Sequence, residues 1–356
     1  MSRIARIGLI GTGWWATTAH IPALISNPYA ELVAISDARS NVLSQAAKRY
    51  SISNTYTNYR DMIDQEHLDG VVVAVWHSAH YEVAHTCLGK RLHVMLEKPM
   101  VLTAKHARSL VESSNKYDRE LIIGYPWLFT THAKRAQDVV NSGELGQIRY
   151  INCVFASTCI QFYRGEDSTY KKTFNYPVIG PGDVYSDPER SGGGQGHLQV
   201  THSAGLMHFI SGLKPVSVMA LMNNLDVNVD VVDAMVVRMD NGALATVGST
   251  GNLRPEDPDT LTIQMYCENG SIDLNFTAGS GTIHHSNGSE ESLPTPQEDS
   301  DIYPVHATSG NLVDVISNNA PNGSPGSIGI HTVEMLDAAY RSASTGGSAV
   351  NVDTLY

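Results

Sequence analysis

Short apolar runs alternate with amphipathic stretches through the first third of the chain. The apolar runs carry consecutive Val, Ile and Leu residues, as in Val71–Val75, which is typical of strands that helices cover on both faces. The predicted strands are Ile4–Ile10, Leu32–Ser36, Gly70–Val75, Leu92–Leu96 and Leu121–Gly124. The predicted helices between them are Val42–Tyr50, His80–Lys90 and Ala104–Tyr117. This alternation predicts βαβ units and a parallel, doubly wound sheet.

The pattern changes after Gly124. A helical stretch, His132–Ser142, leads to a strand, Ile148–Ala156, and later strands follow one another without intervening helices. These later strands are Val216–Asn223, Ala234–Asp240, Leu244–Ser249, Leu261–Cys267 and Ser271–Phe276. Asn-Gly pairs stand at 241–242, 269–270 and 287–288, and they indicate tight hairpins because type I′ turns need positive φ. We expect an α+β domain with a large, mostly antiparallel, open sheet.

Four further segments complete this half of the chain. Ser157–Arg190 is long and rich in Tyr, Gly, Pro and Asp, and Gln199–Ser211 has helical spacing. The polar stretch Ser286–Thr308 is expected to be a surface loop, and His331–Ser344 a final helix. Because 356 residues exceed one ordinary core, we predict a Rossmann domain over 1–124 and a substrate-binding and oligomerisation domain over 125–356.

Composition excludes several classes of partner. Hydrophobic residues make up 42% of the chain and charged residues 17%, as in globular proteins. The net charge of −12 argues against a nucleic-acid partner, and no apolar run approaches the roughly 20 residues of a membrane span. The four cysteines lack CxxC spacing and are expected to be reduced thiols. A cytoplasmic location is the simplest expectation.

The first predicted strand runs into a glycine motif, G-x-G-x-x-A, that opens a helix. Gly11 permits the tight turn, Gly13 lets the backbone approach a pyrophosphate, and Ala16 lets the helix pack on the strand. Asp37 ends the second strand, where a carboxylate accepts hydrogen bonds from both ribose hydroxyls. This pattern predicts NAD as the cofactor. NADP stays open, because Arg39 is placed to pair with a 2′-phosphate.

The fifth strand ends in Glu97-Lys98-Pro99. Ligands of open α/β sheets bind outside the carboxyl ends of the strands, and Pro99 restricts the residue before it to an extended conformation. Lys98 is therefore expected to point into the nicotinamide crevice. Glu-Lys-Pro and the glycine motif together make the chain resemble the Gfo/Idh/MocA family, the glucose–fructose oxidoreductase and inositol dehydrogenase group.

The resemblance covers essentially the whole chain. It includes Ala19-His20-Ile21-Pro22-Ala23-Leu24, Ser78-Ala79-His80 and Ala338-Ala339-Tyr340-Arg341-Ser342-Ala343. It implies an NAD(P)-dependent oxidoreductase of carbohydrate metabolism that acts on CH–OH groups, with Lys98 as a catalytic lysine. The cofactor contacts expected beside Gly11, Gly13, Ala16, Asp37, Arg39 and Lys98 are Trp14, Trp76, His77, His80 and Glu97.

The family's second catalytic element is a glycine run followed by Asp-x-x-x-His. Here Ser191–His202 places His202 on the family histidine, but Leu198 stands where the family has its aspartate. The chain is similar to a subgroup with Gly-Gly-Gly-Gln that lacks this Asp. We predict His202 as the general base, because imidazole accepts protons near neutral pH. Gln199, or less directly His197, is the expected substitute that hydrogen-bonds the His202 ring.

A metal site is not expected. His197, His202 and His208 are spaced by five and six residues, which does not place them on one helix face.

Aromatic residues dominate the predicted substrate region. The family often has Arg where Trp127 or Leu128 stands, so this chain offers fewer cations to an anionic substrate. Tyr residues recur through Ser157–Arg190, and aromatic rings suit sugar faces, although they equally suit loop packing or an interface. The predicted substrate contacts are Lys98, Tyr125, Trp127, Tyr163, Tyr185, Gln199 and His202.

These observations predict a dehydrogenase that oxidises a secondary hydroxyl of a neutral sugar or glycoside. Three alternatives stay open: an inositol dehydrogenase, an NAD-dependent glycosidase or lyase that uses transient oxidation, and a non-catalytic ligand-sensing regulator. The open sheet predicts a homodimer or homotetramer, because an uncovered sheet face favours self-association.

Overall fold

The computed structural model describes residues 3–171, 176–296 and 298–356, so residues 172–175 of the predicted insert lie outside it. The N-terminal part is a six-stranded parallel sheet with the strand order β3-β2-β1-β4-β5-β6. Its strands are β1 (Ala5–Ile10), β2 (Ala30–Ser36), β3 (Thr55–Tyr56), β4 (Gly70–Val73), β5 (His93–Leu96) and β6 (Leu121–Ile123). The prediction of a Rossmann fold is confirmed, and the sequence missed only the two-residue edge strand β3 among these.

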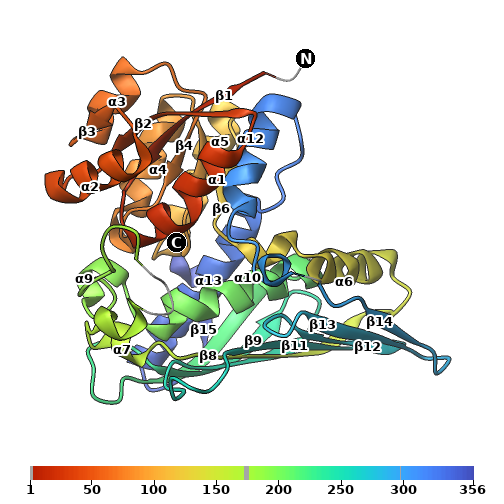
Figure 1. Cartoon of the computed structure of the whole chain (residues 1–356). Coiled ribbons are helices and arrows are strands. Elements are labelled where there is room, and N and C mark those ends of the chain that lie inside the picture. The colour runs from red at the N-terminus through yellow and green to blue at the C-terminus, as the bar shows by residue number, and fades with distance from the viewer. Residues whose placement is uncertain (1–2, 172–175, 297) are drawn as a thin grey trace.

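Helices follow the strands of this part, as the sequence predicted for most of them. They are α1 (Ile21–Ser26), α2 (Ser40–Tyr50), α3 (Tyr59–Gln65), α4 (His80–Gly89) and α5 (Ala104–Tyr117), and a π-helical turn (Ala16–His20) precedes α1. The strand residues Val71, Val72 and Val73 are fully buried, because helices cover both sheet faces (Figure 1). The α3 helix was not predicted.

The C-terminal part is a nine-stranded sheet with the order β14-β13-β12-β11-β7-β10-β9-β8-β15. Among the described residues of this sheet, only β7 and β10 pair in parallel, so the predicted mostly antiparallel sheet is confirmed. Its strands are β7 (Ile148–Ala156), β8 (Pro215–Asn223), β9 (Val232–Met239), β10 (Leu244–Thr250), β11 (Thr260–Cys267), β12 (Gly270–Asn275), β13 (Ser280–His285), β14 (Glu290–Leu293) and β15 (Val350–Asn351). All three Asn-Gly pairs lie at hairpins: β9 to β10, β11 to β12, and β13 to β14.

One face of this sheet carries helices and the other is open. The helices α6 (Thr131–Ser142), α10 (Thr201–Ser211) and α13 (Gly326–Ser344) lie on the face of the sheet that is turned toward the Rossmann domain (Figure 1). Along β9 the side chains alternate strictly between buried and exposed positions, as expected for a sheet covered on one face. Exposed apolar side chains of the sheet include Met219, Leu221 and Val236, of which Leu221 is 62% exposed.

The prediction that Ser286–Thr308 is a surface loop is wrong. This stretch contains β14, which pairs with β13, and the short helix α11 (Asp299–Ile302). The helix α12 (Ala307–Asn318), also not predicted, packs against β1, β4, β5 and β6, with Leu312 and Val313 fully buried. The chain therefore returns to the N-terminal sheet near its end, and the domain division at residue 124 stays a prediction.

Short helices build the insert that follows β7. They are α7 (Ile160–Tyr163), a 3₁₀ turn (Asp167–Tyr170) and α9 (Pro188–Ser191), after which a π-helical segment (Gly196–Val200) leads into α10. None of the helices in the described ranges has the length and hydropathy to cross a membrane.

Candidate active site

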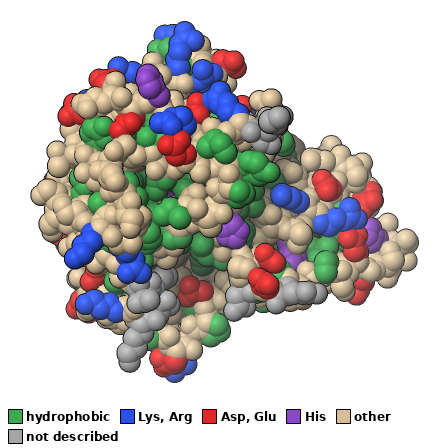
Figure 2. Space-filling model, turned by 45° about the horizontal axis from the view of Figure 1, so that its top comes forward, with side chains coloured by type: hydrophobic (Ala, Val, Ile, Leu, Met, Phe, Trp, Pro, Cys, Tyr) green, Lys and Arg blue, Asp and Glu red, His purple; other side chains and the backbone are tan. Residues whose placement is uncertain are grey.

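A cavity of about 780 Å³ lies where the two parts of the chain meet. Residues at the carboxyl ends of β1, β2, β4 and β5 line one side, and residues of the insert, of the segment leading into α10, and of 302–303 line the other. Hydrophobic side chains gather in the hollowed middle of this face, and most charged side chains surround them (Figure 2). The cavity has the position expected for a ligand of an open α/β sheet.

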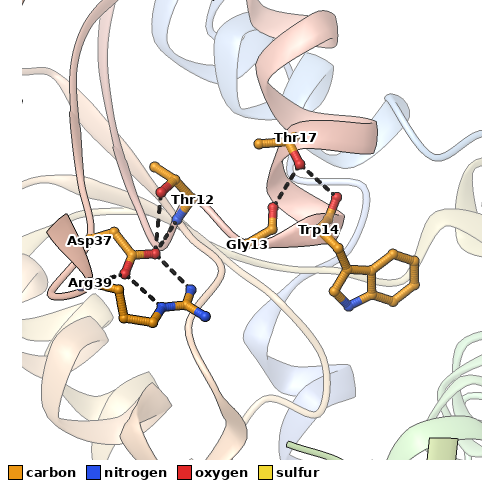
Figure 3. Close-up of polar contacts among 6 residues, drawn as sticks. All are labelled: Thr12, Gly13, Trp14, Thr17, Asp37 and Arg39. Carbon is orange, nitrogen blue, oxygen red and sulfur yellow. Dashed lines mark hydrogen bonds and ion pairs between the residues drawn. The ribbon is translucent and has the colours of Figure 1, made fainter. Parts of the chain in front are cut away.

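The glycine motif forms one wall of the cavity. Gly11 has φ +92°, and a side chain there would overlap the backbone carbonyl of Ala74, so the tight turn requires glycine. A Cβ at Gly13 would meet only the end of the Arg39 side chain, at 3.7 Å, which leaves the backbone open to a ligand. The Thr17 hydroxyl donates to the carbonyls of Gly13 and Trp14 and fixes the start of the helical segment (Figure 3). This turn fits the pyrophosphate of a dinucleotide.

Asp37 lies beside this turn, and both of its carboxylate oxygens accept hydrogen bonds (Figure 3). Its Oδ2 accepts from the N–H of Thr12 at 2.9 Å and from Arg39 Nη2 at 2.9 Å, and its Oδ1 accepts from Arg39 Nε at 3.0 Å. Burial alone would raise the pKa of Asp37, but the hydrogen bonds and charge of Arg39, with the Thr12 N–H, hold it below its usual value. The Asp37 carboxylate, which the sequence predicts at a ribose, therefore forms an ion pair with the Arg39 guanidinium.

The Glu-Lys-Pro turn brings a buried carboxylate, Glu97, and a half-buried amine, Lys98, together. Glu97 Oε1 accepts from Trp15 Nε1 at 3.0 Å and lies 2.9 Å from His20 Nε2, which explains the histidine of the Ala19–Leu24 motif. Lys98 Nζ donates to the backbone carbonyl of Leu198 at 2.9 Å. Burial lowers the pKa of Lys98, and the Glu97 carboxylate opposes that shift. Lys98 is thus held at the cavity wall with its proton affinity reduced.

His202 lies in the first turn of α10 and also lines the cavity. Burial, and secondarily the charge of Lys98, lower its pKa well below 6.5, so the ring is neutral at pH 7. Its Nδ1 is buried without a hydrogen-bond partner among the described residues. The Trp127 ring stands nearly perpendicular to it, with the ring centroids 5.1 Å apart.

The predicted substitute for the family Asp is wrong. Gln199 Nε2 donates to Cys159 Sγ at 3.1 Å rather than to His202, although Gln199 does line the cavity. His197 stacks on Tyr340 with the ring centroids 4.5 Å apart and does not bond His202 either. The π-helical start of this segment changes the side-chain spacing from the α-helical one that the prediction assumed.

Most of the predicted site residues come together in the cavity. Those that line it are Gly11, Gly13, Trp14, Asp37, Arg39, Trp76, His77, Glu97, Lys98, Trp127, Tyr185, Gln199 and His202.

Four predicted site residues lie behind the wall instead. Ala16 is buried in the helix–strand packing, and the His80 ring lies within hydrogen-bonding distance of two backbone carbonyls, those of Pro99 and Val75. Tyr125 is buried with its hydroxyl 3.1 Å from Thr201 Oγ1, and Tyr163 donates to Gln195 Oε1 at 2.7 Å. Both tyrosines are therefore packing residues in this structure and do not line the cavity.

The cavity also contains residues that sequence reasoning missed. Tyr303 packs on Trp127 with the ring centroids 4.3 Å apart, although it belongs to the stretch predicted to be a surface loop. Trp15, Phe155 and Phe162 add further aromatic walls. The Trp15 position was visible inside the glycine motif, whereas nothing in the polar context of Tyr303 signalled its place.

Comparison with known proteins covers both parts of the chain. Residues 5–125 match a family model described as an oxidoreductase family with an NAD-binding Rossmann fold, and residues 133–273 match the GFO/IDH/MocA C-terminal domain.

Individual relatives agree with these matches. The rhizopine catabolism protein MocA of Rhizobium meliloti is 28% identical over 42% of this chain and 46% of its own length. The myo-inositol 2-dehydrogenase of Thermotoga maritima is 29% identical over 40% of this chain and 42% of its own length. The chain thus spans less than half the length of these curated relatives. An oxidoreductase of Agrobacterium radiobacter, solved with NAD+, L-tartaric acid and magnesium, shares the fold with a TM-score of 0.81 at 17% identity, over 99% of this chain and 100% of its own.

Proposed function

The chain belongs to the Gfo/Idh/MocA family of oxidoreductases, and on this basis we propose that it is an NAD-dependent dehydrogenase that oxidises a secondary hydroxyl of a neutral sugar or glycoside. One observation carries the proposal. The residues suited to a dinucleotide, Gly11, Gly13 and Asp37, line the same cavity as the proton-handling residues Lys98 and His202. A ligand-sensing regulator has no need for that second pair.

When bound, NAD would supply the oxidant in this proposal, as the acceptor of a hydride from the substrate. Gly11 and Gly13 would let the pyrophosphate approach the N–H groups at the start of the helical segment that follows, and Asp37 would hold the ribose. The aromatic walls around Lys98, among them Trp127 and Phe155, exclude water from the reacting carbon.

Lys98 and His202 handle the hydroxyl proton. Both have lowered pKa values, so both reach the unprotonated, proton-accepting state at lower pH than free side chains do. His202 lines the cavity, and Lys98 is oriented by the Leu198 carbonyl. Either group within hydrogen-bond reach of the hydroxyl takes its proton as the C–H bond breaks.

The cavity wall favours a neutral, ring-shaped substrate. Lys98 and Arg39 are the only Lys or Arg side chains among the described residues that line it, and Arg39 is paired with Asp37 at the ribose end. The described lining residues thus leave no guanidinium for a phosphate or carboxylate near Lys98. Trp127, Tyr303 and Tyr185 offer apolar faces of the kind that sugar rings stack on.

The open face of the nine-stranded sheet is proposed as a contact between copies of the chain. It carries exposed apolar residues such as Met219, Leu221 and Val236, and a C2 dimer would cover them symmetrically.

NADH formation tests the proposal. Purified protein with NAD is assayed at 340 nm against free aldoses, inositols and alkyl glycosides, and products are analysed for cleavage or elimination. We expect NADH with at least one neutral sugar or glycoside. A Tyr185→Ala variant should raise KM for a glycoside more than for its parent sugar. Cleavage without net NADH, or turnover of free myo-inositol well above every glycoside, would contradict the substrate assignment.

A further inference from the structure

One aspartate accepts hydrogen bonds from three successive backbone N–H groups, which lie just before the helix that carries His202. Asp230 Oδ1 accepts from the N–H of Gly194 at 2.7 Å, its backbone carbonyl from Gln195 at 2.8 Å, and its Oδ2 from Gly196 at 2.7 Å. Asp230 is 4% exposed and lies 36 residues along the chain from Gly194. We propose that Asp230 is a positioning residue for the reaction. Its contacts with residues 194–196, which we call the Asp230 clamp, fix the helical segment that contains His202 and the Leu198 carbonyl to which Lys98 donates.

The clamp explains the glycine run. A Cβ at Gly194 would overlap the backbone carbonyl of Asp230, and a Cβ at Gly193 would overlap the hydroxyl of Tyr340. A Cβ at Gly196 would stand 2.6 Å from that same hydroxyl. Glycine is thus required at three positions by close approach of Asp230 and Tyr340.

Tyr340 supports the clamp from α13. Its hydroxyl donates to Asp230 Oδ1 at 2.8 Å, and its ring stacks on His197 at an interplanar angle of 19°. Tyr340, the tyrosine of the Ala338–Ala343 motif, is therefore linked to the glycine run by the Asp230 carboxylate, which accepts hydrogen bonds from both. A buried carboxylate is also stabilised by the free N–H groups and the positive dipole end of the helical segment it caps.

A short series of contacts joins the clamp to the reacting groups. The Leu198 N–H donates to the Gly194 carbonyl at 2.8 Å, and the Leu198 carbonyl accepts from Lys98 Nζ at 2.9 Å. His202 follows four residues after Leu198 on the same continuous helical segment. Any shift of the residues at 194–196 therefore moves the lysine's acceptor and the histidine together. Misplacement of reacting groups by about 1 Å can lower a rate by about 100-fold.

The test is Asp230→Asn, which keeps the shape but replaces one carboxylate oxygen with an NH2 group that cannot accept. The N–H of Gly194 or Gly196 then loses its acceptor. Because the inference rests on the proposed function, we expect kcat for the oxidised sugar to fall at least about 10-fold. The Kd for NAD, measured by tryptophan fluorescence, should stay within about twofold, since the clamp does not touch the glycine motif at Gly11 and Gly13.

The matched control is Asp226→Asn. Asp226 lies in the same stretch, is 63% exposed and pairs with Arg164 on the surface, so its replacement should leave kcat unchanged. If the Asp230 variant loses NAD binding and kcat in the same proportion as its folded fraction, the residue is merely structural and the inference is wrong.

A second readout needs no substrate. The ring nitrogen resonances of His202 in the ¹⁵N-histidine-labelled protein should shift in Asp230→Asn and not in Asp226→Asn. If the wild type oxidises no sugar, the proposed function fails while these resonances still decide the clamp. Should Asp230→Asn not fold, Tyr340→Phe removes one hydrogen bond to the clamp, and we expect shifted His202 resonances and a several-fold lower kcat. Unchanged resonances and unchanged kcat in the foldable variant would overturn the inference.

Discussion

Replacing Arg39 with alanine should sharpen the preference of the protein for NAD over NADP. In the structure the Arg39 guanidinium lies 2.9 Å from Asp37 Oδ2, so the pair presents almost no net charge to the position of a 2′-phosphate. Removing Arg39 leaves the Asp37 carboxylate unopposed. Removing Asp37 instead leaves a guanidinium that attracts the phosphate.

The magnitude can be worked from Coulomb's law. Two unit charges about 4 Å apart interact by about 4 kcal/mol at an effective dielectric constant of about 20. The Arg39 side chain is 41% exposed, so solvent and salt screen this interaction, and we retain about 1–2 kcal/mol. The NADP-to-NAD ratio of Kd values should therefore rise about 5- to 30-fold in Arg39→Ala, because 1.4 kcal/mol corresponds to about a factor of ten.

The assay is the Kd of each dinucleotide, measured by calorimetry at low and physiological ionic strength. The wild type should prefer NAD, Arg39→Ala more strongly so, and Asp37→Ala should narrow or reverse the preference. The difference between variants should shrink as salt is added. Equal changes in the affinities for NAD and NADP in Arg39→Ala, or an unchanged ratio in Asp37→Ala, would refute the charge-pair account.

Three other outcomes are expected. Lys98→Ala and His202→Ala should each lower kcat at least about 100-fold with the Kd for NAD nearly unchanged. Lys105→Ala on the surface of α5 serves as the control. Near wild-type turnover in the Lys98 or the His202 variant would remove the residue replaced in it from the mechanism. The acid limb of the pH profile of kcat/KM should lie below pH 6.5, because burial lowers the pKa of His202 and the base is protonated only when the pH falls through that lowered value. An acid limb at or above pH 7 would contradict His202 as the general base. Leu221→Asp combined with Val236→Asp on the open sheet face should give a 38.6 kDa monomer by light scattering, where the wild type gives an oligomer. A monomeric wild type at micromolar concentration would contradict the proposed interface.

Much of the molecule follows from local sequence patterns. Runs such as Val71–Val75 predict buried parallel strands, and each Asn-Gly pair marks a hairpin, because strand burial and turn type depend on neighbouring residues. Motifs whose residues are adjacent in sequence were also predictable. Gly11 with Gly13, and the Glu97-Lys98 pair, reach the cavity that their positions at strand ends indicated.

Only the tertiary structure decided which side chains share the cavity beyond those motifs. Tyr303 arrives from a polar stretch, and Tyr163, one of several similar tyrosines in the insert, is buried behind the wall. Gln199 donates its hydrogen bond to Cys159 instead of to His202, from a π-helical turn that no residue pattern predicted.

The same holds for the support of the catalytic segment. Asp230 caps N–H groups 36 residues away, and Tyr340 joins it across 110 residues. The sequence determined the periodic elements and the turns, because these depend on residues a few positions apart. Contacts between distant residues depend on how whole elements pack, and packing follows from shape and volume summed over the core, which no short pattern encodes.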